Sequence, residues 1–414
     1  MVNKSNQWNL DGWKLNPKSL VIFGLITIPF YELLVYLSIP GVQMPALPDT
    51  RIPKEYVSLL LMIVISYSVM SIGSLKPILN KWILFFIGFA IFSAFKSPPF
   101  MTSIGTKNFT GMWNYEPIFK MLVYFLGFMS ITSLDWTKQE IGKVLKVMAY
   151  CAVAMSGYVI IQKLGLDQLF VTRSVNQSGW TPSPELAGML GQSTLVASFI
   201  AVCFPAMIYI RTKLIVVAVV ALFFLNSDFA WVTVVFISVY WLLYYRKGWI
   251  MILWSMTILA VVIPFSVWCI DPDMMRIGHS GRFPVWKNVL IDIQSAPMNG
   301  VGKFCWSGMG IGSFYFIFSL MHETKFQSAH NEYLEILWGT GIIGLGLFLM
   351  GCVWFIAHAY EIESREVKAL SIIFASFLVS AMGTFIFQLP AHAFYVVVVL
   401  ALLNNQIGER TCIS

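Results

Sequence analysis

The chain has 414 residues, of which 58% are hydrophobic and only 11% are charged, and its formal net charge is +7. Soluble domains have roughly a quarter charged residues, and a surface this poor in charge would not keep so large a globule in solution. The composition excludes a soluble enzyme, a disordered scaffold and a nucleic-acid-binding domain, and it indicates an integral membrane protein.

Apolar runs of about the length of a membrane-spanning helix, roughly 20 residues, recur along the whole chain. Lys4, Lys14 and Lys18 precede the first run, which lacks a small-residue cleavage pattern and so indicates a retained helix rather than a signal peptide. We predict an all-α polytopic protein with about 12 transmembrane helices. The predicted spans are 20–39, 57–75, 82–95, 117–134, 144–164, 186–210, 213–226, 229–245, 249–270, 333–358, 367–388 and 391–407.

The basic residues predict how these helices are oriented, because cytoplasmic loops carry an excess of Lys and Arg. With the N-terminus inside, 15 of the 27 basic residues fall on the inner side, and five of the outer ones lie in one long loop. We therefore expect both termini in the cytoplasm. The predicted regions are 1–270 with helices one to nine, the large external loop 271–332, and 333–414 with helices ten to twelve and the cytoplasmic C-terminus.

The external loop contains a helical pattern of its own. Phe283, Trp286, Leu290 and Ile293 recur at helical spacing, which predicts an amphipathic helix lying along the outer leaflet. A glycine-rich turn at 300–312 and a second apolar stretch at 313–321 follow it.

The first candidate site lies at the start of this helix, in the run Gly-Arg-Phe-Pro-Val-Trp at 281–286. The guanidinium fork of Arg282 can hold two phosphate oxygens at the level of the lipid headgroups. Lys287 and Lys303 are the nearest additional cations in the loop. The alternative is that Trp286 is an interfacial anchor and Arg282 a solvated charge.

The second candidate site is the run Ala-His-Asn-Glu-Tyr-Leu-Glu at 329–335, which opens the tenth span. His330 can act as a base or as a donor to a phosphate. Asn331 and Glu335 are four residues apart and fall on one helix face. The alternative is helix capping, with the four glycines between 339 and 346 serving close helix packing.

Three further features are weaker. His392 lies in the predicted external turn before the last span, on the same side as Arg282 and His330, although a lone histidine there is often only a polar turn residue. The Asp-Pro-Asp run at 271–273 resembles a metal-binding DxD, but a proline at a helix end favours a turn, and we expect neither a metal nor another cofactor. Glu32 lies within the first span, where an ionisable residue is costly.

Taken in order, the motifs resemble those of the O-antigen ligase and O-antigen polymerase superfamily. The matching features are Gly-Arg-x-x-x-Trp at 281–286, Pro-x-x-Gly-x-Gly at 297–302, His-Asn-x-x-Leu at 330–334 and the Gly-x-x-Gly helix that follows. The resemblance covers roughly 280–350, and the plan of 12 spans with one large external loop extends it over the chain. Weaker similarity occurs at 111–115, 191–193 and 390–392.

The resemblance implies a bacterial inner-membrane glycosyltransferase with a GT-C-like fold, active at the periplasmic face in cell-envelope polysaccharide biosynthesis, for example of lipopolysaccharide. Its implied partners are a glycan donor linked to undecaprenyl pyrophosphate, a glycan, lipid or protein acceptor, and the bilayer, with no nucleic acid. One departure stands out. Members of the family commonly carry an arginine in a Ser-Arg-Gly-type turn before the eighth span, and here that turn reads Asn-Ser-Asp-Phe-Ala-Trp at 226–231. Either another cation (Arg173, Arg276, Lys287 or Lys303) replaces this arginine, or donor handling differs.

Pyrophosphate is a good leaving group, so the site must mainly supply positive charge and an acceptor for the proton of the incoming hydroxyl. On this hypothesis Arg282, with Lys287 or Lys303, binds the pyrophosphate. His330 is the base or a second phosphate contact, and Asn331, Glu335, His392 and Trp286 support them. Direct attack inverts the anomeric carbon, and cationic side chains make a metal unnecessary. The alternatives are a transporter or flippase of lipid-linked saccharides, which would carry midplane charges and inverted repeats, and a non-catalytic relative that binds the lipid carrier.

Overall fold

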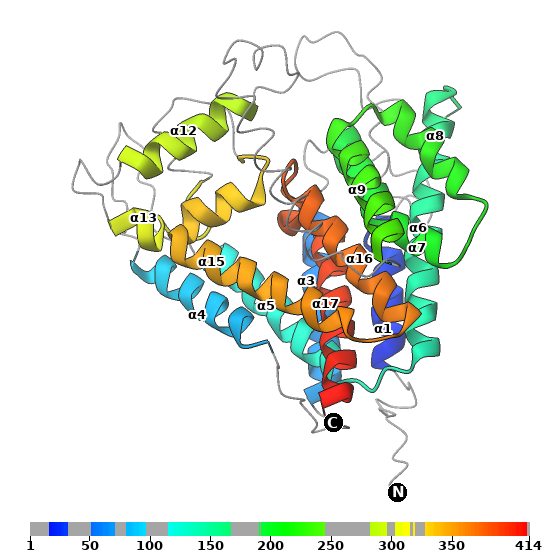
Figure 1. Cartoon of the computed structure of the whole chain (residues 1–414), viewed down its shortest axis with the longest axis horizontal. Helices are drawn as coiled ribbons and strands as arrows, with labels where there is room; N and C mark the ends of the chain where they lie inside the picture. Colours follow the sequence, from blue (N-terminus) through cyan, green and yellow to red (C-terminus); the bar gives the residue numbers. More distant parts are fainter. Residues whose placement is uncertain are drawn as a thin grey trace, which may run out of the picture.

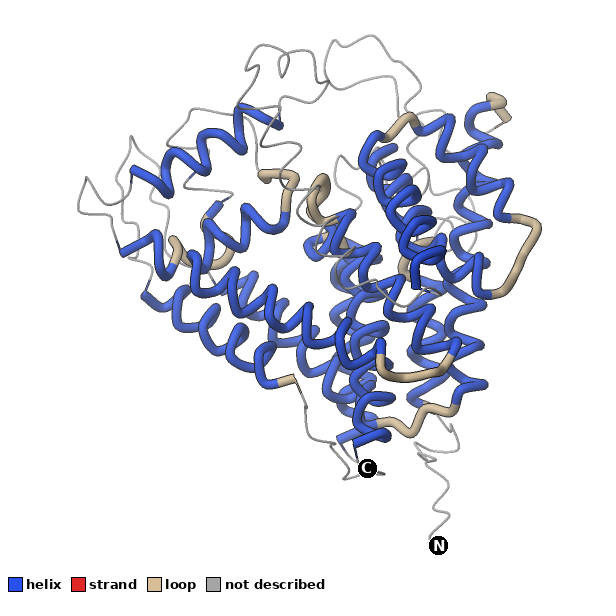
Figure 2. Tube along the Cα trace, viewed as in Figure 1, coloured by secondary structure: helices blue, strands red, loops and turns tan. Residues whose placement is uncertain are grey.

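The computed structural model describes residues 16–31, 51–70, 80–96, 115–166, 190, 192–244, 282–295, 303–314, 318 and 328–411. Within these ranges every regular element is a helix, and Figure 2 shows no strand among them. The helices are α1 (Pro17–Thr27), α3 (Arg51–Met70), α4 (Lys81–Lys96), α5 (Tyr115–Ser133), α6 (Lys138–Lys163), α7 (Ser193–Tyr209), α8 (Ile215–Leu225), α9 (Asp228–Tyr244), α12 (Arg282–Ser295), α13 (Lys303–Ser307), α15 (Glu332–Tyr360), α16 (Arg365–Ser380), the short 3₁₀ helix η4 (Ile386–Gln388) and α17 (Pro390–Thr411).

The all-α prediction is confirmed for this part of the chain. Eleven of the twelve predicted spans overlap a described helix, whereas 249–270, Glu32 and the Asp-Pro-Asp run at 271–273 lie outside the described residues. Three helices, α6, α15 and α17, are long and apolar enough to cross a membrane, and several others are apolar but shorter. The count of twelve stays a prediction. One boundary was wrong, because α16 ends at Ser380 and 381–389 form a turn and η4 rather than the end of a span.

Several helices begin at residues whose side chains satisfy the first backbone N–H groups. Thr137 and Glu140 form a capping box at the start of α6, in which each side chain accepts a hydrogen bond from the other's backbone N–H. Asn80 accepts from the N–H groups of Trp82 and Ile83 at the start of α4, and its own amide donates to the Gly351 carbonyl (2.9 Å). Capping therefore sets helix starts and, at Asn80, also joins two helices.

Contacts between helix ends show that the chain runs up and down through the bundle. Lys18 at the start of α1 forms an ion pair with Glu140 at the start of α6 (2.7 Å). The hydroxyl of Tyr209, at the end of α7, donates to Glu366 at the start of α16 (2.9 Å). At the ends of α17 and α5, the Asn405 amide donates to the Thr132 carbonyl (3.0 Å). All these contacts lie at one end of the bundle, so α3, α7 and α17 begin together at the other end (Figure 1). We call that end the site face.

The main hydrophobic core lies between α1, α3, α5, α6, α7, α16 and α17. A smaller apolar cluster lies beneath α12 and contains Val285, Val289, Phe314, Phe318 and Trp338. Figure 1 shows α12 over the first turns of α15, and α4 alongside the rest of that helix. Large apolar side chains also cover the outside of the bundle, as lipid-facing helices require.

The long helix α15 is broken at Gly341, which has φ +67°. The backbone at Gly341 interrupts the regular hydrogen bonds of the α-helix. The carbonyls of Trp338 and Gly339 instead accept hydrogen bonds from the N–H groups of Met309 (2.8 Å) and Gly310 (2.9 Å). The Ser93 hydroxyl of α4 lies 2.7 Å from the Gly339 carbonyl oxygen. The groups released by the break are thus satisfied by protein, which is what non-helical backbone in a membrane protein needs.

Candidate functional site

The start of α15 carries the second predicted motif, and it is bonded firmly to the segment that follows α16. Asn331 is the N-cap residue, and its side-chain oxygen accepts from the Leu334 N–H (3.2 Å). The Glu332 N–H donates to the Ala381 carbonyl (2.9 Å), and the Glu332 carboxylate accepts from the Phe387 N–H (2.8 Å). Asn331 and Glu335 were predicted to share a face, and the structure gives them different partners, with Asn331 serving as the cap.

Glu335 holds the loop that precedes α15. One of its carboxylate oxygens accepts from the Ala329 N–H (2.8 Å) and from the Ser328 hydroxyl, and the other accepts from the side-chain amide of Gln388. Glu335 therefore joins the loop before α15 to η4. Both acidic residues lie in the first turn of the helix, where the helix dipole favours negative charge.

His330 lies between these two anchors. Its backbone is in the left-handed region (φ +50°), which turns the chain immediately before the cap, and its N–H donates to the Ser328 hydroxyl oxygen (3.1 Å). The half-buried imidazole packs edge-on against the Phe385 ring, with centroids 4.9 Å apart. A non-glycine residue in this conformation is uncommon and persists where its surroundings fix it. Glu335 and Phe385 provide that fixation.

The first predicted motif is docked onto the same loop. The indole N–H of Trp286 in α12 donates to the Ala329 carbonyl (2.6 Å), next to His330. The Trp286 ring also lies against the ring of Phe229 at the start of α9, with ring centroids 6.4 Å apart. Trp286 thus links three segments on the site face. Arg282 and Lys303 are the first residues of α12 and α13, and their side chains lie outside the described set, whereas Lys287 is exposed.

The α8–α9 turn, in which the resemblance would place an arginine, packs against this assembly. Asn226 closes α8 in the left-handed conformation (φ +47°), and Phe229 follows at the start of α9. A Cβ placed on Gly383 would lie 2.1 Å from the Phe229 ring, so the turn touches the segment after α16 as well as Trp286. The departure at 226–231 therefore lies beside the candidate site.

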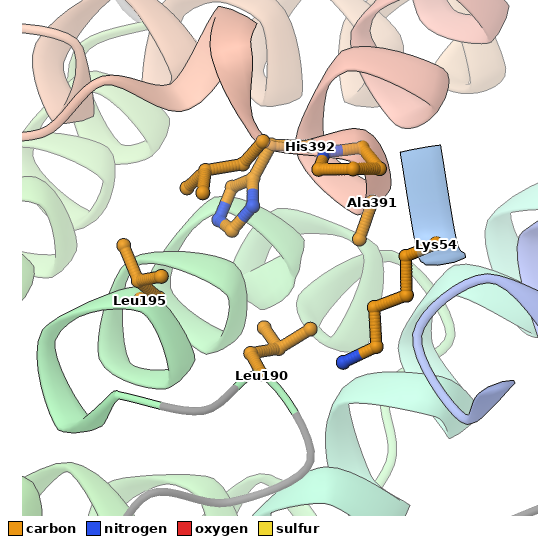
Figure 3. A pocket seen from close by; sticks show the side chains of 7 residues that line it. Lys54, Leu190, Leu195, Ala391 and His392 are labelled. Atoms are coloured by element: carbon orange, nitrogen blue, oxygen red, sulfur yellow. The ribbon is translucent and has the colours of Figure 1, made fainter. Parts of the chain in front are cut away.

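His392 was predicted in an external turn, but α17 begins at Pro390 and places this histidine in its first helical turn, with 1% of its surface exposed. Its Nε2 lies 2.9 Å from the Ser198 hydroxyl oxygen of α7. The ring lines a small cavity, shown in Figure 3, together with Lys54 of α3, Leu190, Leu195, Leu389, Pro390 and Ala391. Lys54 is also buried.

Sequence reasoning missed Glu332, Gln388 and Lys54. Gln388 was given no role, because its amide is brought to the Glu335 carboxylate only by the folding of the chain. Lys54 carried a signal that could have been used, since a cation in the first turn of a helix opposes the helix dipole. Among the described residues, no group of His, Cys, Asp and Glu has the arrangement of a metal site.

Comparison with known protein families covers the α8–α9 turn, α12 and the start of α15, but not the segment after α16. Residues 213–349 match the O-antigen ligase family. This match supports membership in the O-antigen ligase superfamily. No curated protein matches it closely enough to add a more specific assignment. The matched region runs from α8 into the second half of α15, so it includes Arg282, Trp286, His330 and Glu335 but neither Lys54 nor His392.

Proposed function

We propose that this O-antigen ligase homologue transfers a glycan from an undecaprenyl-pyrophosphate-linked donor to an acceptor hydroxyl at the external face of the bacterial inner membrane. The observation that supports this most is the hydrogen bond between Trp286 and Ala329. It brings the helix that begins with Arg282 and the loop that carries His330 into one assembly within the matched region.

In this reaction the acceptor oxygen forms a bond to the anomeric carbon while the bond from that carbon to the pyrophosphate oxygen breaks. The electron pair leaves with the pyrophosphate, which Arg282, Lys287 and Lys303 stabilise by their charge. His330 accepts the proton of the acceptor hydroxyl. Attack from the face opposite the leaving group inverts the anomeric carbon, and the reaction as proposed is metal-independent.

The proposal gives a positioning role to three residues, Glu335, Asn331 and Trp286. Glu335 and Asn331 fix the backbone on either side of His330, and Trp286 fixes α12 against the same loop. A proton acceptor must lie within hydrogen-bond reach of the group it deprotonates, so the polar anchors around His330 serve the chemistry although they do not perform it.

Complementation of a deletion strain, read by a polysaccharide gel, tests the proposal. We expect His330→Ala and Arg282→Ala to abolish the glycan product at normal membrane levels of protein. Trp286→Phe, which keeps an aromatic ring and removes one hydrogen bond, should reduce it by up to about tenfold. His358→Ala is the matched control, because His358 is near the opposite end of α15 and bonds only locally to the Trp354 carbonyl. It should support normal product.

The same strains separate the alternatives. Loss of the ladder down to one capped repeat indicates a polymerase, whereas an uncapped core with accumulated lipid-linked polymer indicates a ligase. Accumulation of lipid-linked saccharide on the inner leaflet alone would indicate a flippase and contradict the proposal. So would normal product from His330→Ala.

A further inference from the structure

An exposed stripe along α6 changes its chemistry part-way along the helix. Lys143, Lys146 and Tyr150 follow one another at helical spacing, and all three side chains are exposed. The next exposed positions on this side of the helix are Ala154 and Ile161. The stripe is therefore basic near the start of α6 and apolar further on, with a tyrosine, which has an apolar ring and a polar tip, at the change.

The turn between α7 and α8, at 210–214, shows the same change beside α6. Arg211 and Lys213 are exposed in this turn, and they are followed directly by exposed apolar side chains, Leu214 (46%) and Val216 (63%). The helix α8 itself contains no charged residue. Its outer surface is therefore suited to contact with lipid chains, and this surface begins directly after two cations.

Two contacts place the α7–α8 turn beside the basic part of the α6 stripe. The hydroxyl oxygen of Tyr209, just before the turn, would lie 3.3 Å from a Cβ placed on Gly142. Gly142 and Lys146 are one turn apart, so they share a side of α6. Further along, the Lys163 ammonium lies 5.9 Å from the centroid of the Phe224 ring, and Figure 1 shows α8 next to α6. Lys146 therefore lies close to the end of α7 and to the turn that leads into α8.

Four exposed cations make up what we call the basic patch, namely Lys143, Lys146, Arg211 and Lys213. Within the described part of the chain, none of the four forms an ion pair. The acids at the starts of the adjoining helices have other partners. Glu140 pairs with Lys18 (2.7 Å), and Glu366 accepts a hydrogen bond from Tyr209 (2.9 Å). The basic patch thus concentrates positive charge without an acid of its own.

The positive-inside rule explains why basic residues gather at this end of the bundle. It does not explain the depth of Lys146, which is eight residues past the start of α6 and so about 12 Å along the helix axis. An outward-facing ammonium at this depth in a membrane helix is costly. An anionic headgroup beside it would reduce that cost, because it supplies the opposite charge.

We propose that the basic patch binds the headgroup of an anionic phospholipid, with its acyl chains against the apolar surface of α8 and the apolar part of the α6 stripe. Basic surfaces between membrane helices bind such headgroups. A phospholipid matches both parts of this surface, whereas a free phosphate matches only the cations. The basic patch lies at the end of the bundle opposite the site face, so the proposal does not rest on the proposed function.

Native mass spectrometry of the purified full-length protein in a non-ionic detergent tests the proposal. The probe is phosphatidylglycerol, and phosphatidylcholine, which has no net charge, is the comparison. Each lost cation should weaken the binding of phosphatidylglycerol by about fivefold. The double variant Lys146→Gln, Lys213→Gln should therefore weaken it by about 25-fold. Lys163→Gln is the matched control, because Lys163 is an exposed lysine at the other end of α6, and it should bind phosphatidylglycerol as the wild type does.

A second measurement uses the unaltered protein and so does not depend on the folding of a variant. Raising the salt concentration should release phosphatidylglycerol and leave the weak binding of phosphatidylcholine unchanged, because salt screens exposed charges. Glycerol phosphate, which has the headgroup charge without the chains, should not compete at equal concentration.

Equal binding of the two phospholipids would overturn the proposal, as would unchanged binding of phosphatidylglycerol in the double variant or at high salt. Effective competition by glycerol phosphate would overturn its lipid part and leave a site for a free phosphate.

Discussion

At the scale of single residues, one carboxylate determines where the candidate base lies. The Glu335 side chain bonds both to the loop before α15 and to η4, through Ala329 and Gln388. His330, which follows Ala329 directly, has a strained backbone that this loop holds in place. The position of His330 therefore depends on a residue that need not touch the substrate.

Glu335→Ala tests this dependence. The change leaves the Ala329 N–H and the Gln388 amide without their acceptor, and we expect it to destabilise the protein by about 1–3 kcal/mol. Thermal unfolding in detergent micelles measures the change, and glycan product should fall further than the loss of folded protein explains. Glu363→Ala, an exposed acid between α15 and α16, is the control. Equal stability of the two variants would contradict the role given to Glu335.

At the scale of elements, the break in α15 lets the first half of that helix pack against α13 and the following turn. Gly308 approaches α15 so closely that a Cβ on it would lie 2.3 Å from the Gly339 carbonyl carbon. The alternative interpretation of the glycines, as residues for close packing, holds at Gly339 and Gly341. It does not hold at Gly346, where a Cβ would meet nothing within 4 Å.

Gly341→Ala is expected to destabilise the protein by at least about 1–3 kcal/mol, because a side chain is strained at this backbone conformation. Its Cβ would also lie 2.4 Å from the carbonyl carbon of Trp306. Gly346→Ala in the same helix should be neutral or stabilising by up to about 1 kcal/mol. Comparison of the two unfolding midpoints in micelles checks this. A lower unfolding midpoint for both variants would instead indicate that α15 does not tolerate larger residues in general.

At the scale of the whole molecule, the up-and-down chain places Lys54, His330, Trp286 and His392 at one end of the bundle. The basic residues of the loops predict that this end is external. The contacts within the bundle establish that these residues share one end. The side of the membrane on which this end lies stays a prediction.

Cysteine labelling tests the orientation. In a variant without native cysteines, Leu166→Cys lies beyond the end of α6 at the site face, and Glu363→Cys lies at the opposite end; both positions are exposed. We expect a membrane-impermeant maleimide to label Leu166→Cys in spheroplasts and Glu363→Cys only after permeabilisation. The reverse pattern would put the site face in the cytoplasm and exclude the proposed external reaction.

Hydropathy predicted the positions of the helices well, but it did not predict the contacts that join them. The span predicted at 229–245 is α9 at 228–244, because continuous apolar character is a property of the local sequence. The segment 381–388 is equally apolar but turns, and it supplies partners for Glu332 and Glu335. The bond between Trp286 and Ala329 joins residues 43 apart, and Lys54 and His392, far apart in the sequence, line the same cavity. No periodicity or spacing contains such contacts, since they arise from packing.

The break at Gly341 also has a mechanical consequence. A continuous helix transmits its tilt along its length, and membrane helices change tilt when bilayer thickness changes. In α15 the part before Gly341 is held by protein on two sides, by Met309 and Gly310 and by the 378–388 segment. We expect tilting of the part from Ile342 to Tyr360 to be absorbed at the glycine, which insulates the geometry around His330 from the lipid composition.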